Sequence, residues 1–113
     1  MIGADAFHVC YGVRREVDAD DAATVEALEL QRHPWQVAAK QYRLQSWWGI
    51  TIDERRLFVM VGRMVGHYGR EGEAAGQLAD TDAAAMVFET NERLRATGIE
   101  GVPAWHFQFE PDR

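Results

Sequence analysis

Apolar and polar residues alternate in three segments of the chain, and this period of two predicts β-strands. The first covers residues 7–13, the second covers residues 44–53, and the third follows Pro103. Residues 57–65 are apolar on both faces of an extended chain, which is typical of a central strand covered on both sides. The polar residues 53–56 are of hairpin length. The pattern therefore predicts four strands, of which the middle two form a hairpin.

Helix-forming residues fill the connection between the first two strands. Acidic residues at 18–21 precede a helix over residues 24–32, where their side chains can accept hydrogen bonds from free N–H groups. Pro34 is expected to end this helix and to open a second, short helix over residues 35–43. His33 precedes that proline, and its expected role is capping and packing rather than catalysis.

The connection between the last two strands contains a loop and a third helix. Residues 66–76 are rich in glycine and charge, which predicts a loop. Asp80, Thr81 and Asp82 offer N-cap chemistry for a helix that runs to about residue 97. Gly98 is then expected to adopt the left-handed conformation that ends many helices.

This order of elements predicts an α+β fold for one domain over residues 1–113. Strand, helix, strand, strand, helix, strand is the ferredoxin-like split βαβ arrangement, here with an extra short helix after Pro34. We expect a four-stranded antiparallel sheet with its helices on one face. The first strand would lie between the third and the fourth, and the second strand would lie at an edge.

The two faces of the predicted sheet differ in how they are covered. The helix-covered face is expected to form the core, from Phe7, Val9, Tyr11, Val13, Trp48, Ile50, Ile52, Val59, Val61, Trp105, Phe107 and Phe109. The other face carries His8, Cys10, Arg14, Trp47, Thr51, Phe58, Met60, Met64, His106 and Gln108. Apolar area in water costs about 25 cal/mol per Å², so this second face is too apolar to stay bare. The sequence leaves three alternatives for what covers this face. They are a second copy or another protein, a ligand in a cavity, and the chain's own residues 35–43 or long loop.

Candidate chemistry lies mainly on that second face. His8 and His106 are expected on adjacent strands, with Cys10 two residues from His8, and imidazole and thiolate are competent metal ligands. A neutral histidine is also a general base near pH 7. The favoured alternative is that both histidines are polar residues lining an interface, because a shift of one residue in register would separate them.

Two further features indicate binding. The loop of residues 66–73 fits no phosphate-loop or dinucleotide pattern. It is either a structural turn or a rim that presents His67, Tyr68 and Arg70 to a partner. Trp47 stands beside Trp48 in sequence and so points to the second face, and exposed tryptophans are common in binding hot spots.

Composition narrows the functional classes. The chain has 113 residues, 47% of them hydrophobic and 27% charged, and a net charge of −6. This balance disfavours nucleic acid and anionic membranes as partners. Cys10 is the single cysteine, so no intramolecular disulfide forms. The apolar runs are far shorter than a membrane helix, the N-terminus does not resemble a signal peptide, and a cytoplasmic protein is expected.

We therefore predict a non-enzymatic binding module, most simply a homodimer through the second sheet face. Trp47, Phe58, Met60 and Met64 would form its apolar centre, and His8, Arg14, His106 and Gln108 its polar edge. One alternative is a small-molecule enzyme or carrier of the dimeric α+β barrel type, with His8 or His106 as acid or base in a cavity. Another is an inhibitor, such as a toxin-neutralising protein, of a basic partner. No motif indicates a cofactor or a catalytic triad, and none is predicted.

Overall fold

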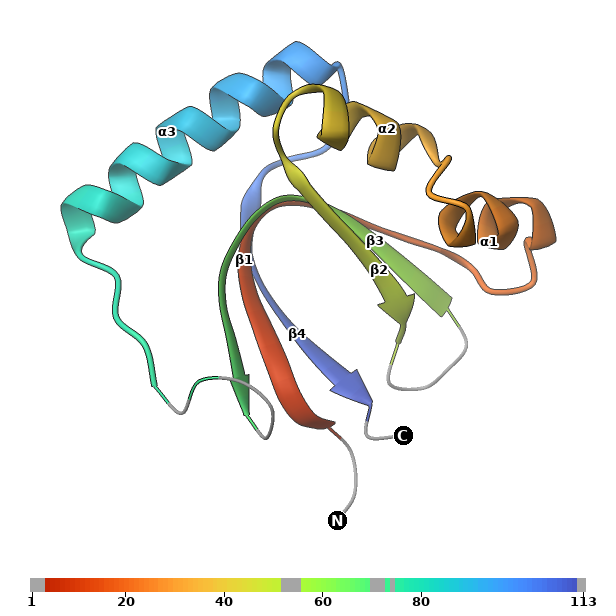
Figure 1. The fold of residues 1–113 in the computed structure, drawn as a ribbon, viewed down its shortest axis with the longest axis horizontal. Coiled ribbons are helices and arrows are strands. Elements are labelled where there is room, and N and C mark those ends of the chain that lie inside the picture. Colours follow the sequence, from red (N-terminus) through yellow and green to blue (C-terminus); the bar gives the residue numbers. More distant parts are fainter. Residues whose placement is uncertain (1–3, 52–55, 70–72, 74, 112–113) are drawn as a thin grey trace.

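The computed structural model in Figure 1 describes residues 4–51, 56–69, 73 and 75–111, with the backbone alone at 4–6 and 109–111. It is an α+β fold with a four-stranded antiparallel sheet, as predicted, in the order β2-β3-β1-β4. The elements along the chain are β1 (Ala4–Asp18), α1 (Ala22–Glu29), α2 (Pro34–Gln41), β2 (Gln45–Ile50), β3 (Arg56–Gly69), α3 (Asp80–Thr97) and β4 (Ala104–Pro111).

The two central strands are long and divide the sheet into two halves. β2 pairs with residues 57–62 of β3, whereas β4 pairs with residues 4–12 of β1. We call the part with β2 and residues 12–18 of β1 the β2 half. The part with β4 and residues 62–69 of β3 is the β4 half. Figure 1 shows β1 and β3 bending between these halves, with the helices on the outer side of the bend.

A pair of glycines lies where the halves meet. Gly12 is the partner of Gly62 in the β1–β3 register. A β-carbon on Gly12 would lie 2.1 Å from the carbonyl oxygen of Val61, and one on Gly62 would lie 2.0 Å from the carbonyl oxygen of Tyr11. Only glycine therefore fits at either position, and the backbones approach closely on the inner side of the bend. A register shift beside Cys10 adds to the distortion.

The helices close the outer face of the β2 half. Leu28 of α1 is fully buried against Leu57 and Val59 of β3. Ala39 of α2 and Leu94 of α3 pack together with Val13 and Val61. The extra helix after Pro34 is confirmed, but it does not fold over the second face, because α2 packs on β2 and β3 from the same side as α1.

Side chains cap the first two helices as the sequence predicts. Asp21 accepts a hydrogen bond from the Thr24 N–H at the start of α1. At the start of α2, Nδ1 of His33 accepts from the Trp35 N–H at 3.1 Å, and the Gln36 side chain accepts from the His33 N–H. The capping role of His33 is thereby confirmed. This reciprocal pair satisfies two N–H groups that the helix itself leaves unpaired.

Two predictions around α3 are wrong. Residues 66–69 are not a loop but the end of β3, because their backbone pairs with residues 6–9 of β1, and this pairing outweighs the glycine content. The N-cap of α3 is Ala79, which makes no side-chain capping bond, so Asp80, Thr81 and Asp82 are not the N-cap. Asp80 and Asp82 lie in the first turn, where their charge complements the helix dipole. Gly98 does end α3 in the left-handed conformation.

The predicted core is wrong at β4. Trp105 is 39% exposed and Phe107 is 65% exposed, although both lie on the helix side of the sheet. The reason is coverage rather than register, because α3 packs mainly on β1 and β3 and β4 lies beyond it at the sheet edge. The predicted turn at 53–55, the Ile52 and Phe109 side chains and Arg70 fall outside the described residues.

Candidate functional site

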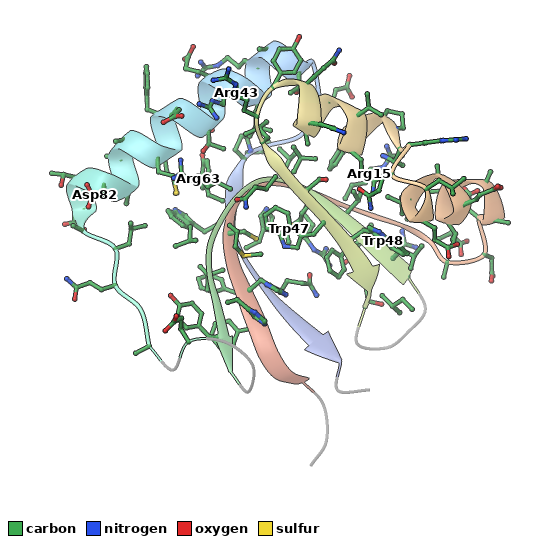
Figure 2. The ribbon with its side chains drawn as sticks, viewed as in Figure 1. Arg15, Arg43, Trp47, Trp48, Arg63 and Asp82 are labelled. Atoms are coloured by element: carbon green, nitrogen blue, oxygen red, sulfur yellow. The ribbon has the colours of Figure 1, made fainter. Side chains whose placement is uncertain are left out.

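The face of the sheet without helices, here called the helix-free face, carries the predicted apolar centre. Cys10, Phe58 and Met60 form one buried cluster, and Trp47 and Met64 pack against it. Phe58 is only 5% exposed and Met60 only 2%. These two side chains are therefore buried within the single chain. Figure 2 shows Trp47 on the concave side of the bent sheet, so curvature brings the side chains of this face together.

Arg14 organises the polar part of this face in the β2 half. Its Nε donates to Oε1 of Gln108 at 2.9 Å, and its Nη1 donates to Oε2 of Glu16 at 2.7 Å. The hydrogen bond from Arg14 lowers the pKa of Glu16. The Arg14 guanidinium also lies 5.2 Å from the centre of the Phe58 ring. Arg14 and Gln108, which we predicted at a binding edge, are thus bonded to one another.

The histidines of this face are in the β4 half. The rings of His8 and His67 stack with their centres 4.4 Å apart and their planes 18° from parallel. His106 lies opposite Cys10 in the neighbouring strand, as the sequence suggested, but its Nε2 lies 3.1 Å from the backbone oxygen of Gly12. The contact between His8 and His67 was not predicted, because it requires β3 to extend through residue 67.

The environment of Cys10 favours the neutral thiol over the thiolate. Burial raises the pKa of its thiol to about 11, and the positive charge of Arg14 offsets this only in part. The thiol lies 3.4 Å from the sulfur of Met60, as a donor. Over the described ranges, no three residues among His, Cys, Asp and Glu are grouped to hold a metal ion. Among these described residues, His8, Cys10 and His106 do not form such a group.

Two polar atoms on the helix-free face are buried without a hydrogen-bond partner among the residues that the structure describes. They are Nε1 of Trp47 in the β2 half and Nε2 of His67 in the β4 half. A buried polar group without a partner costs about 1–3 kcal/mol of stability. Folded proteins leave few such groups, and each one calls for an explanation, such as a bound water or ligand.

The outer face of the β4 half is the largest departure from the predicted burial. The Trp105 ring meets Tyr11 edge-on at 5.3 Å, and the Tyr11 hydroxyl donates to Oδ1 of Asn91 on α3 at 2.9 Å. Phe107, two residues farther along β4, extends past this contact into solvent. Tyr68, predicted to lie on a loop rim, is in β3, and its ring packs 5.4 Å from Phe7. Aromatic side chains therefore line a partly exposed strip along this half.

Comparison of the chain with protein-family models, curated proteins and solved structures found no significant match. Within the ranges given above, no helix combines the length and the apolar character needed to cross a membrane.

Proposed function

We propose that this protein is a non-enzymatic binding module with the ferredoxin-like split βαβ fold, working as a homodimer. The strand order supports this fold, with α1 and α2 together forming the first crossover and α3 the second. A cytoplasmic, reducing setting belongs to the same proposal, because the free thiol of Cys10 is buried.

Exposed aromatic residues on an edge strand carry this proposal. β4 ends the sheet, so its outer backbone groups lack a neighbouring strand among the described residues. Trp105 and Phe107 on the same strand offer apolar area that water solvates poorly. An edge of this kind is a template for strand addition. The β4 strand of a second copy, running antiparallel, would extend the sheet to eight strands about a twofold axis.

The interface that the sequence suggested is less suitable. Phe58 and Met60 are already buried inside one chain, so a partner on the helix-free face would remove little more of their area from water. Phe107 has most of its side chain available. The proposed dimer interface therefore lies at β4.

Replacement of Phe107 by lysine tests this interface. Light scattering should find a dimer for the parent chain and a monomer for Phe107→Lys, because a charge on an edge strand opposes pairing. Phe88→Lys is the matched control: Phe88 is 69% exposed, but it lies on α3 rather than on the edge strand. A monomeric parent chain, or a Phe107→Lys variant that remains dimeric, would refute the proposed interface.

A second candidate function is carriage of a small ligand on the helix-free face. It is favoured by the unpaired Nε1 of Trp47 and Nε2 of His67, since a hydrogen-bonding group of a ligand would satisfy either atom. The stacked His8 and His67 rings would form one wall. The buried Cys10, Phe58 and Met60 cluster would form an apolar floor.

Native mass spectrometry of the gently purified protein tests this second candidate. A retained small molecule should be present on the parent chain and on Trp48→Phe, whose indole packs on the helix side. It should be lost from Trp47→Phe, which lacks the unpaired N–H group. Absence of any retained mass, or equal retention by the two variants, would rule the carrier function out.

A further inference from the structure

A small cavity on the helix side of the sheet gathers three arginines from three different elements. It has a volume of about 350 Å³ and lies between the start of β2, the middle of β3 and α3. Arg43 precedes β2, Arg63 is on β3, and Arg93 is on α3. Figure 2 shows Arg43 and Arg63 on the side of the sheet that faces α3. This cavity is separate from both the β4 edge and the helix-free face.

Arg93 is held in place by the protein itself. Its Nη1 donates to the backbone oxygen of Arg43 at 2.9 Å, and its Nη2 lies 2.5 Å from Oε1 of Glu89. Glu89 also lines the cavity and balances the charge of Arg93. This arrangement holds the backbone of the turn before β2 against α3. It therefore also holds the backbone of Arg43, from which the Arg43 side chain extends.

The other two arginines carry uncompensated charge. Over the described ranges, neither the Arg43 nor the Arg63 guanidinium makes a hydrogen bond or an ion pair. Arg14, Arg56 and Arg95, by contrast, each contact a glutamate. With Arg93 and Glu89 cancelling, the cavity keeps two positive charges in a chain whose net charge is −6. A concave site with a local excess of positive charge attracts anions.

We propose that this cavity binds the phosphate group of a small molecule. A phosphate monoester carries about −1.5 to −2 charges at pH 7, which matches the two uncompensated arginines better than a single carboxylate does. Guanidinium groups also donate paired hydrogen bonds to phosphate oxygens. The volume is at the small end for ligand sites, which suits a phosphate with a short organic group. Leu44 supplies apolar lining for that group.

Titration with inorganic phosphate, followed by amide NMR shifts, tests the site. Sodium chloride keeps the ionic strength constant, so general screening does not contribute. We expect saturable shifts at Arg43, Arg63 and Thr90, which all line the cavity. Acetate should bind at least about 10-fold more weakly, because it can satisfy only one of the two charges. Phosphoserine is the organic probe: tighter binding than inorganic phosphate identifies a phosphomonoester, and equal binding identifies free phosphate, both in support of the site.

Two variants and a control complete the test. Arg63→Gln and Arg43→Gly should each weaken phosphate binding about 10-fold or more, through loss of a charge-assisted hydrogen bond. Arg43 has a φ of 59°, so glycine retains that backbone conformation, and this variant is expected to fold even if Arg63→Gln does not. Arg32→Gln, an exposed arginine elsewhere, should bind like the parent chain. No saturable shift, equal binding of acetate, or an equal loss in Arg32→Gln would each overturn the proposal.

Discussion

The two halves of the sheet share their central strands but are covered in different ways. In the β2 half, α1 and α2 close the outer face over Leu57 and Val59, and the inner face is filled by Phe58 and Met60. In the β4 half, α3 reaches β1 and β3 but leaves Phe107 exposed. An alternating pattern specifies which side chains share a face. How far a helix extends over that face depends on the connections between elements, which the pattern does not describe.

We propose that this difference separates a stabilising region from a recognition region. The β2 half contains the fully buried Leu28 and two helices whose first N–H groups are capped by side chains, so most of its apolar contacts are made within the chain. The β4 half keeps exposed aromatic rings and the stacked histidines, whereas an edge strand is common to both halves. Surfaces of this second kind are those that proteins use for partners.

The largest expected effect compares one apolar residue from each half. Leu28→Ala should lower the free energy of unfolding by about 2–5 kcal/mol, because it opens a cavity in a closed core. Phe107→Ala should change it by less than about 0.5 kcal/mol, because an exposed side chain loses little on truncation. Chemical denaturation at a protein concentration low enough to keep the chain monomeric measures both. Similar losses of unfolding free energy for the two variants would contradict the proposal that the β2 half stabilises the fold and the β4 half binds a partner.

The glycine pair at the boundary between the halves gives the next largest expected effect on stability. Gly12→Ala should cost about 1–3 kcal/mol or more, because its methyl group would meet the backbone of β3 and force the strands apart. Gly49→Ala is the matched control, since a β-carbon there meets only the Phe58 ring at 3.0 Å, and a side chain can adjust. Thermal unfolding of both variants should rank Gly12→Ala as the less stable. The reverse ranking would mean that the bend does not depend on the glycine pair.

A smaller expected effect is the pH dependence of stability that comes from His33, which caps α2 in the β2 half. Burial, followed by the positive charge of Arg15, lowers the pKa of His33 below its ordinary value of 6.5. The unfolded chain therefore takes up a proton at a pH where the folded chain does not. The contribution of His33 to the free energy of unfolding is complete above pH 6.5. It is lost as the pH falls from 6.5 through the lowered pKa that His33 has in the folded chain.

His33→Asn tests this assignment, because its side-chain oxygen can still accept the Trp35 N–H without titrating. Urea denaturation between pH 7.5 and pH 5 should show a shallower fall in stability for the variant than for the parent chain. Parallel curves for the two proteins would show that another group causes the pH dependence.

Sequence reasoning recovered the N-terminal caps of α1 and α2, the C-terminal cap of α3 and the face of most side chains, because these depend on neighbours in the chain. Asp21, His33 and Gly98 act on N–H and carbonyl groups within a few residues, and their roles were predicted correctly. It failed at residues 66–69, where pairing with a distant strand overrides a glycine-rich composition. The contact between His8 and His67 was missed for the same reason.

The cavity lined by Arg43, Arg63 and Arg93 could not be predicted from the sequence either, because the three arginines are far apart in the chain. No spacing rule relates a turn, a strand and a helix that meet only after the sheet has formed. Charge composition pointed the other way, because a net charge of −6 averages over the whole chain and hides a local excess of arginine.

The order of residues alone determined the period of each segment, the number of strands, and which side chains point to the same face, because these follow from local backbone geometry. Tertiary structure decided where the sheet bends, which half the helices cover, and which arginines and histidines meet. Those outcomes depend on contacts between residues distant in sequence, and a periodic pattern contains no information about such distances.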